Sequence, residues 1–261
     1  ETALVGRNDA PVAGDDEATA VAGGSPVLID ALANDTDPDG DESPSSLRIV
    51  AAQADSGARI EVPAGAGQPL LYKPGTTAAF AGLGQDETAT DTVRYWIEDG
   101  HGQRSAAPGV ITVTVTGAND PLVAIDDLLR VGAGQPETVA INLLANDVDT
   151  DLHDTPRVVA VAGDAAAVGR WTTLASGARV LVTEGGQVTY DPAGRFDALS
   201  AGENALDQFD YTASDGHGAT ASATARVLLT GVNEAPLANP DQASVVAGGD
   251  ALKIVQQHRL G

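Results

Sequence analysis

Apolar and polar residues alternate along many short segments of the chain, with the period of β-strands rather than of helices. In DTVRYWIEDG at 91–100, the side chains of Val93, Tyr95 and Ile97 fall on one face. The runs VITVTVTG at 110–117 and ARVLLTG at 225–231 are rich in β-branched and aliphatic residues. Gly, Pro, Asn or Asp bounds each segment, so the pattern predicts an all-β protein of short strands joined by turns.

The spacing of these segments predicts about seven strands in each of two units of roughly a hundred residues, which is typical of an immunoglobulin-like Greek-key β-sandwich. Only 78–90 and 196–206 have a pattern that a short turn of helix would fit. The expected strands lie near 12–22, 25–33, 46–54, 57–62, 68–73, 91–98 and 109–117, and then near 123–131, 137–145, 156–163, 177–183, 186–190, 207–214 and 219–230.

Several motifs recur in the same order. NDAP at 8–11 returns as NDP at 119–121 and as NEAP at 233–236, at spacings of 119−8=111 and 233−119=114 residues. Further repeated pairs are LANDTDPDGD with LANDVDTDLHD, SGARIEV with SGARVLV, and DGHG with a second DGHG. Because a repeat of this length holds its own core, each is expected to be an independent domain rather than a solenoid unit.

The repeat positions predict four segments within a longer polypeptide. Residues 1–7 are the last strand of a preceding repeat, 8–118 the first complete repeat and 119–232 the second. Residues 233–261 begin a truncated third repeat, and their final KIVQQHRLG fits no element of the pattern.

A D-x-x-x-Y motif occurs at Asp91–Tyr95 and again at Asp207–Tyr211, on the penultimate strand of each repeat. It resembles the tyrosine corner of immunoglobulin-like sandwiches, with Ile97 and Ala213 where an antibody domain has its second cysteine.

Composition narrows the possible partners. The chain has 37 acidic residues against 14 basic ones, for a formal net charge of −23, and it contains no cysteine. Nucleic acid and anionic membranes require a basic face, so neither is expected as a direct partner. No apolar run is long enough to span a membrane. Aromatic residues make up only 3% of the chain, so the thin cores are expected to need many small contacts or a bound ion.

The acidic residues gather at three places in each repeat: the entry, the loop after the second strand and the loop after the sixth. In a seven-strand sandwich these three places lie at the same end, which is where the preceding domain arrives. Two carboxylates ~6 Å apart at an effective dielectric of ~20 repel by roughly 3 kcal/mol. A divalent cation reverses this effect, and calcium prefers hard oxygen ligands from Asp, Asn and backbone carbonyls.

The sequence therefore predicts calcium binding by Asp15, Asp16, Asp35, Asp37, Asp39, Asp41 and Asp99, and at the next junction by Asn119, Asp120, Asp126, Asp127, Asp147, Asp149, Asp151 and Asp215. Asp35-x-Asp37-x-Asp39 followed by Gly40 is a loop that can wrap an ion, but it is not an EF-hand, because Ser46 stands where the bidentate acid belongs. The alternative is that these acids are solvated residues of a soluble or halophilic surface.

The motif series ND-x-P, DD, L-AND-x-D-x-D-G-D, Y-x-P, G-E-x-x-x-D-x-F-x-Y, DGHG and V-T-V-T-G resembles the cadherin-like and VCBS-type repeats of very large bacterial surface proteins. It covers nearly all of 8–232. The resemblance implies tandem immunoglobulin-like domains, calcium at the domain junctions, and an extender role in exported adhesins that often leave by type I secretion. Repeat two departs from the pattern with Thr150, Leu152 and His153 in place of Pro38, Gly40 and Asp41.

The expected function is thus a calcium-rigidified extender within a secreted or surface-attached bacterial adhesin of the biofilm type, monomeric and in contact with neighbouring repeats of its own chain. Other domains of the parent would reach the host or biofilm ligand. A lectin-like or protein-binding module is the main alternative, and a non-catalytic appendage of a secreted hydrolase is a third. No nucleophile motif or aromatic sugar cleft supports an enzyme. His101 and His217 lack the partners that zinc needs and are expected in tight, exposed loops.

Overall fold

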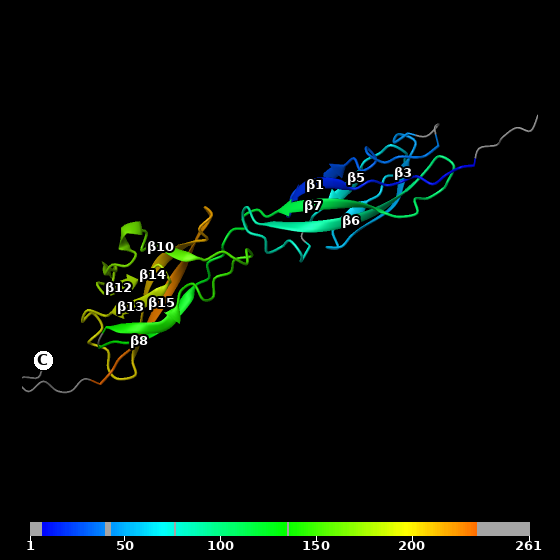
Figure 1. The fold of residues 1–261 in the computed structure, drawn as a ribbon. Helices are drawn as coiled ribbons and strands as arrows, with labels where there is room; N and C mark the ends of the chain where they lie inside the picture. Colours follow the sequence, from blue (N-terminus) through cyan, green and yellow to red (C-terminus); the bar gives the residue numbers. More distant parts are fainter. Residues whose placement is uncertain (1–6, 40–42, 76, 135, 234–261) are drawn as a thin grey trace, which may run out of the picture.

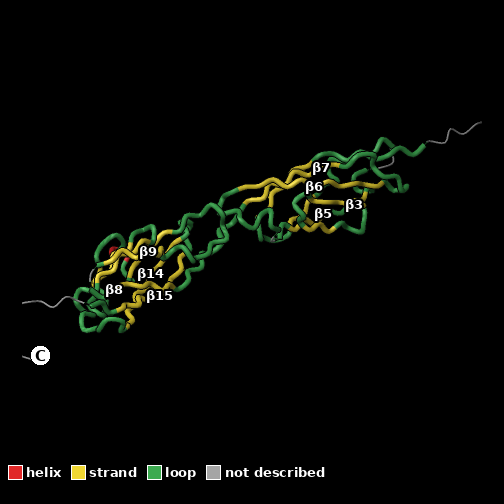
Figure 2. The backbone as a smooth tube through the Cα atoms, turned by 90° about the horizontal axis from the view of Figure 1, so that it is seen from below, coloured by secondary structure: helices red, strands yellow, loops and turns green. Residues whose placement is uncertain are grey.

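Two β-sandwiches follow one another along an elongated molecule (Figure 1, Figure 2). The computed structural model describes residues 7–39, 43–75, 77–134 and 136–233. Strands β1 to β7 form the first sandwich and β8 to β15 the second, which confirms the predicted all-β immunoglobulin-like class. Within the described residues, no helix has the length and hydropathy needed to cross a membrane.

The first sandwich has one sheet in the order β1-β7-β6-β3 and a second in the order β2-β5-β4. β1 pairs parallel with β7, and the other pairs are antiparallel. Its strands are β1 (Asp16–Val21), β2 (Val27–Ile29), β3 (Arg48–Ala54), β4 (Arg59–Glu61), β5 (Leu70–Lys73), β6 (Thr88–Glu98) and β7 (Gly109–Thr116).

The second sandwich repeats this arrangement, with sheets β10-β14-β15-β8 and β11-β12-β13-β9. It adds a short edge strand and a 3₁₀ turn, η1, whose first N–H groups are capped by Asp164. Its elements are β8 (Asp127–Gly132), β9 (Glu137–Asn142), β10 (Arg157–Val161), η1 (Ala165–Ala167), β11 (Thr172–Thr173), β12 (Arg179–Val182), β13 (Gln187–Asp191), β14 (Asn204–Ser214) and β15 (Thr220–Thr230).

Two details of local structure refine the sequence expectations. The segments 78–90 and 196–206, which could hold a short turn of helix, form hydrogen-bonded turns and then the starts of β6 and β14, and no helix is assigned there. Asp86 and Gly202 stand at equivalent positions and have φ of 65° and 85°, a left-handed conformation that ends a right-handed helical turn. The two-residue strand β11 at Thr172–Thr173 was not among the expected strands, because two residues are too few to show alternation.

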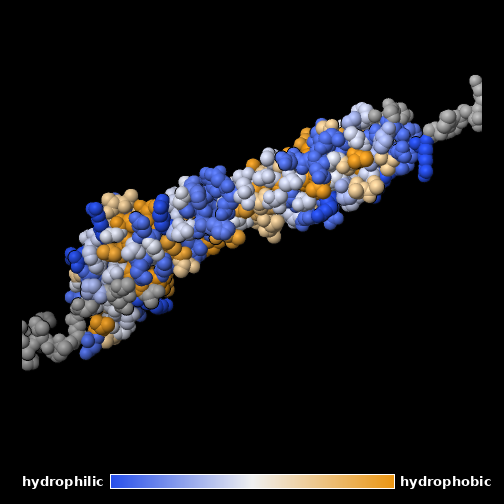
Figure 3. Space-filling model, viewed as in Figure 1, coloured by the Kyte–Doolittle hydropathy of each residue, from blue (hydrophilic) through white to orange (hydrophobic). Residues whose placement is uncertain are grey.

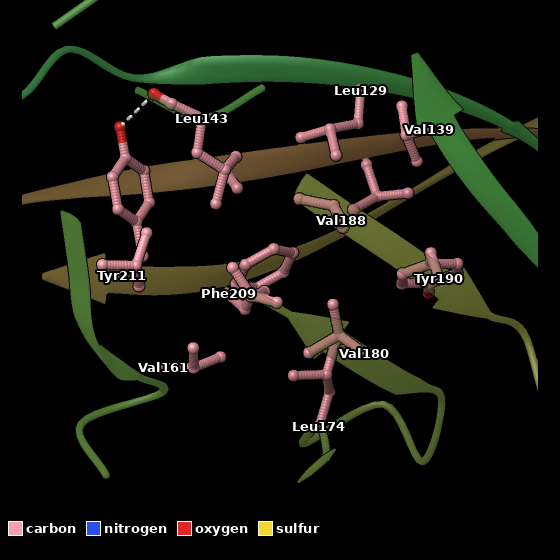
Figure 4. Close-up of a cluster of buried hydrophobic side chains, with 14 of the residues drawn as sticks. Leu129, Val139, Leu143, Val161, Leu174, Val180, Val188, Tyr190, Phe209 and Tyr211 are labelled. Atoms are coloured by element: carbon pink, nitrogen blue, oxygen red, sulfur yellow. Dashed lines mark hydrogen bonds between the residues drawn. The ribbon is translucent and has the colours of Figure 1, made fainter. Parts of the chain in front are cut away.

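Each sandwich has its own apolar core, built mainly from Val, Leu, Ile and Ala. Figure 4 shows the core of the second sandwich. The four tyrosines of the chain, Tyr72, Tyr95, Tyr190 and Tyr211, are all fully buried. A buried hydroxyl needs a hydrogen-bonding partner, and each of these hydroxyls has an acid as a partner. The acids beside Tyr95 and Tyr211 lie in a different part of the sandwich from those beside Tyr72 and Tyr190. Figure 4 shows Tyr211 directed away from the core toward the Leu143 carbonyl.

The expected neighbouring repeats fall almost entirely outside the described residues. Of the segment 1–7 only Arg7 is described, and of 233–261 only Asn233. The division into four segments therefore stays a prediction at both ends of the chain.

Candidate functional site

A cluster around Tyr95 lies at the entry pole of the first sandwich, the end that contains residues 8–16. The hydroxyl oxygen is 2.8 Å from the Ala31 carbonyl, 2.9 Å from Asp35 Oδ1, and 3.0 Å from both Asp16 Oδ2 and the Gly14 carbonyl. A tyrosine hydroxyl has one proton to donate, so it satisfies only one of these four oxygens. Asp35 Oδ1 also accepts the Gly14 N–H at 2.7 Å, and the other oxygens lie close together in a site with an excess of negative charge.

The second sandwich builds the same tyrosine cluster. The Tyr211 hydroxyl is 3.0 Å from the Leu143 carbonyl, 3.1 Å from Asp147 Oδ1 and 3.3 Å from the Ile125 carbonyl. Asp127, the counterpart of Asp16, is only 6% exposed beside them. Both domains of the chain, although their sequences differ, thus place several oxygens around one tyrosine hydroxyl.

Burial makes these carboxylates reluctant to ionise. It raises the pKa of Asp35 to about 6, and the neighbouring Asp16 charge adds to the effect. Burial likewise raises the pKa of Asp127 to about 6, with further contributions from Asp147 and Asp126. A desolvated carboxylate among other oxygens is unstable as an anion unless a proton or a cation neutralises it.

A second group of acids, the entry cluster, lies where the chain enters each sandwich. In the second domain, Asn119 Nδ2 donates to Asp215 Oδ2 at 3.0 Å, and the Asp120 N–H donates to Asp151 Oδ2 at 2.8 Å. The Asp151 N–H in turn donates to Asp149 Oδ1 at 3.0 Å. Ligand oxygens of Asp149, Asp151 and Asp154 all lie within 4.8 Å of one another.

The first domain has the corresponding contacts at the far pole of the molecule. Asn8 Nδ2 donates to Asp99 Oδ2 at 2.8 Å, and the Asp9 N–H donates to Asp39 Oδ2 at 2.8 Å. The Asp39 N–H donates to Asp37 Oδ1 at 2.9 Å. Asp41, also expected here, lies outside the described residues. Hydrophilic side chains gather on the visible face near the middle of the molecule and at its N-terminal end (Figure 3).

Unpartnered oxygens mark both clusters. Among the described residues, seven buried side-chain polar atoms have no hydrogen-bond partner, and six of them belong to residues predicted as ligands. These are Asp35 Oδ2, Asp37 Oδ2, Asn119 Oδ1, Asp127 Oδ2, Asp149 Oδ2 and Asp151 Oδ1. Buried polar atoms are normally satisfied, so a set of orphaned hard oxygens fits an oxygen-binding cation such as calcium.

Some predicted ligands are placed elsewhere. Asp126 Oδ1 accepts the Thr224 N–H at 2.9 Å, and its other oxygen pairs with Arg226 at 2.9 Å. Asp15 Oδ1 accepts the Val110 N–H at 3.1 Å. The structure therefore does not bring Asp15 and Asp126 into either cluster, because their side chains tie the entry segment to the last strand. Asp120 is exposed and contributes its N–H.

The tyrosine-corner interpretation is wrong for both Tyr95 and Tyr211. Their hydroxyls reach oxygens in the entry segment and the loop after the second strand, far away in sequence. The Asp of the motif serves another tyrosine: Asp91 accepts from the Tyr72 hydroxyl at 2.8 Å and from the Ser56 N–H at 3.0 Å. Asp91 is thus a buried acid whose oxygens are satisfied without a cation.

We expect Asp91→Ala to destabilise the first domain by about 2–5 kcal/mol, because it leaves the buried Tyr72 hydroxyl and the Ser56 N–H without an acceptor. Since Asp91 lies outside both clusters, the loss should be the same in calcium and in chelator. Chemical denaturation under the two conditions measures this, and a loss that calcium reverses would contradict the structural role.

Three ionisable residues next to the entry cluster were not among the predicted ligands. His153 Nδ1 lies 2.8 Å from Glu87 Oε1 of the first domain, and His217 Nδ1 lies 3.0 Å from Asp154 Oδ2. The Asp154 contact raises the pKa of His217. Glu87 recurs as Glu203 in the repeated motif, but the motif does not identify its partner, because that contact forms only when the domains stand end to end.

Comparison with known proteins agrees with this architecture. The bacterial cadherin-like domain family matches residues 8–117, and the bacterial Ig domain family matches residues 119–228. No curated protein matches the sequence.

Similar solved structures include human CDH23 EC21-23, at 18% identity over 86% of this chain and 70% of that chain, with a TM-score of 0.48. Human mucin-like protocadherin EC1-2 has 14% identity over 85% of this chain and 98% of its own, with a TM-score of 0.47. Mouse cadherin-23 EC22-24 has 14% identity, covers 86% of this chain and 64% of its own, and has a TM-score of 0.49.

Each family model covers one of the two sandwiches, and both families consist of adhesion-type domains rather than enzymes. The chain is a bacterial cadherin-like tandem repeat, one cadherin-like domain followed by one Ig-like domain.

Proposed function

We propose that this chain is a calcium-rigidified extender segment of a large extracellular bacterial adhesin. The observation that carries the proposal is the set of six orphaned oxygens, which recur at the entry poles of both domains. Cadherin-like domains generally bind calcium, and the donor set here is the all-oxygen set that calcium prefers.

Two groups of residues would hold the cation in each domain. The entry cluster of the second domain offers Asn119, Asp149, Asp151 and Asp154, and the tyrosine cluster offers Asp127 and Asp147 with nearby carbonyls. When bound, calcium supplies positive charge and bonds to oxygens from segments that are far apart in sequence. The protein itself supplies the loop geometry, through N–H donors that already fix one oxygen of Asp149 and one of Asp151.

The mechanical effect follows from where the second entry cluster lies. The Leu152 N–H donates to the Gly82 carbonyl at 3.2 Å, so the acidic loop touches the end of the first domain. Without a cation, the carboxylates of this loop repel one another, and the short linker 117–125 is the natural hinge. Motion between domains is the default when their interface is small.

Small-angle X-ray scattering should show a longer and better-defined maximum dimension in calcium than in chelator. Asp149→Asn with Asp151→Asn should abolish the difference, because it removes two charged ligands while keeping the side-chain size. The control, Asp55→Asn with Asp197→Asn, changes the net charge equally at exposed sites away from the junction. The same stiffness in calcium and chelator would remove calcium from the mechanism and leave the fold intact.

The extracellular, cell-surface setting and the role of other domains in reaching a ligand belong to the same proposal. Protease accessibility of these domains on intact cells that express the parent protein would test it. The lectin-like alternative gains no support from the tryptophans, because Arg104 lies over the Trp96 ring and Arg179 over the Trp171 ring.

A further inference from the structure

The contact between the two domains depends on a glycine. We name residues 80–87 the first exit loop and residues 149–154 the second entry loop. The Leu152 N–H bonds to the Gly82 carbonyl at 3.2 Å. A Cβ atom on Gly82 would lie 2.5 Å from Leu152 Cγ and 2.6 Å from Leu152 Cδ1, so the leucine occupies the space that any other residue at 82 would fill.

Neighbouring residues of the two loops also approach one another. His153 pairs with Glu87, and a Cβ on Gly84 would lie 3.4 Å from Asp154 Oδ1. Leu152 remains 78% exposed. Beside the contact lies a cavity of about 270 Å³, lined from both sides of the junction by residues that include Phe80, Leu83, Ala118 and Thr150. An alanine at 82 would therefore require Leu152 to move from its place against the first exit loop.

The second domain ends in an exit loop of the same backbone shape, residues 196–203. The Ser200 N–H donates to Glu203 Oε2 at 2.7 Å, as the Gly84 N–H donates to Glu87 Oε2 at 2.9 Å. The Gly231 N–H donates to the Glu203 carbonyl, as the Gly117 N–H does to the Glu87 carbonyl.

The side chains of the two exit loops differ at the positions that lie against the entry loop of the next domain. Ala198 stands at the position of Gly82, and Ser200 at that of Gly84. The entry loops differ at the matching position, since the second domain has Leu152 where the sequence of the first has Gly40. A leucine therefore meets a glycine at the observed junction, while the second exit loop carries a methyl group where that leucine would lie.

We propose that the junctions are matched by size, so that the order of the domains is encoded in these loops. The first exit loop accepts an entry loop with leucine, whereas the second accepts a following domain that carries a small residue at that position, as the first domain does. The second exit pole also exposes Leu206 and Val232, at 60% and 44%, where the first has Thr90 and Ala118. Such apolar surface fits a following domain as its occupant.

Point substitutions in the present chain test this directly. Gly82→Ala gives the first exit loop the residue of the second, and Leu152→Gly gives the entry loop the residue of the first domain. The chain has no cysteine, so spin labels on Thr114→Cys and Gln208→Cys report the distance between the domains without interference. Measurements at one fixed, saturating calcium concentration separate this test from the proposed role of calcium.

We expect Gly82→Ala to broaden the distance distribution relative to the parent, and Leu152→Gly added to Gly82→Ala to narrow it again. Gly185→Ala is the control, because a Cβ there would meet nothing closer than 4.0 Å. Thermal melting checks that each domain stays folded. An unchanged distribution in Gly82→Ala, or a double variant as broad as Gly82→Ala, would overturn the proposal.

Discussion

In about 10 mM calcium the chain should melt about 10 °C higher than in chelator. Extracellular calcium modules have dissociation constants of ~10⁻⁴–10⁻³ M, and one site at the tight end of this range is then at a hundredfold excess of ligand, which adds ~2.7 kcal/mol. For a domain of about 100 residues, 1 kcal/mol shifts the melting temperature by roughly 4–8 °C. The physical source is the orphaned oxygens, whose mutual repulsion calcium replaces with bonds. Differential scanning calorimetry measures the shift.

Variants should separate ligation from net charge. Asp35→Ala or Asp37→Ala should reduce the calcium-dependent shift of the first domain, because both residues carry an orphaned oxygen. Asp55→Ala removes the same charge from an exposed site that pairs with Arg94, so it should leave the shift intact. Equal losses from all three variants would mean that the acids act only through the charge of the whole chain.

The strands and the poles of the domains could be predicted from the sequence because both rest on local patterns. Alternation identifies β6 and β7, and the Asp-x-Asp-x-Asp motif identifies the acidic loop in both repeats. The same alternation also distinguishes Asp15 from Asp16. Asp16 is in phase with Ala18 and the buried Ala20, whereas Asp15 is out of phase and lies on the exposed side, where it accepts the Val110 N–H.

Side-chain contacts between residues that are far apart in sequence could not be predicted from a single sequence. The D-x-x-x-Y motif placed Asp91 and Tyr95 on one face of a strand. It did not indicate which residues their side chains contact across the sandwich. Tyr95 reaches Asp35 in one direction, and Asp91 meets Tyr72 in the other. The pairing of Glu87 with His153 depends in addition on how two domains stand end to end, for which a pattern within one domain contains no information.

Removing a buried carboxylate should have opposite effects with and without calcium. In chelator at pH 7.5, Asp127→Asn is expected to stabilise the second domain by up to about 3 kcal/mol, because the pKa of Asp127 is raised to about 6 by burial and its ionisation is unfavourable. In calcium the parent should be the more stable protein, since the amide is a poorer ligand than the carboxylate. Asp35→Asn should behave alike in the first domain, whose carboxyl has a pKa of about 6.

Asp91→Asn is the matched control. Asp91 is 2% exposed, close to the 1% of Asp35, but its oxygens accept hydrogen bonds from Tyr72 and Ser56. An amide cannot accept all of these bonds, so this variant should be destabilised in both conditions.

The pH dependence of stability provides an independent check, because the pKa shifts determine its direction. Because Asp35 and Asp127 have a higher pKa in the folded chain than in the unfolded one, the folded state binds more protons between pH ~4 and ~6. Stability in chelator should therefore rise as the pH falls from 7.5 to 5, by about 1.4 kcal/mol for each group at one unit below its pKa. Each Asn variant should lose the part of the gain that its own carboxyl contributes, and the gain should shrink in calcium, which already neutralises these carboxylates. Denaturant unfolding at the two pH values measures it. A parent that is less stable at pH 5 in chelator would show that ionisation of the buried carboxylates carries no cost for calcium to offset.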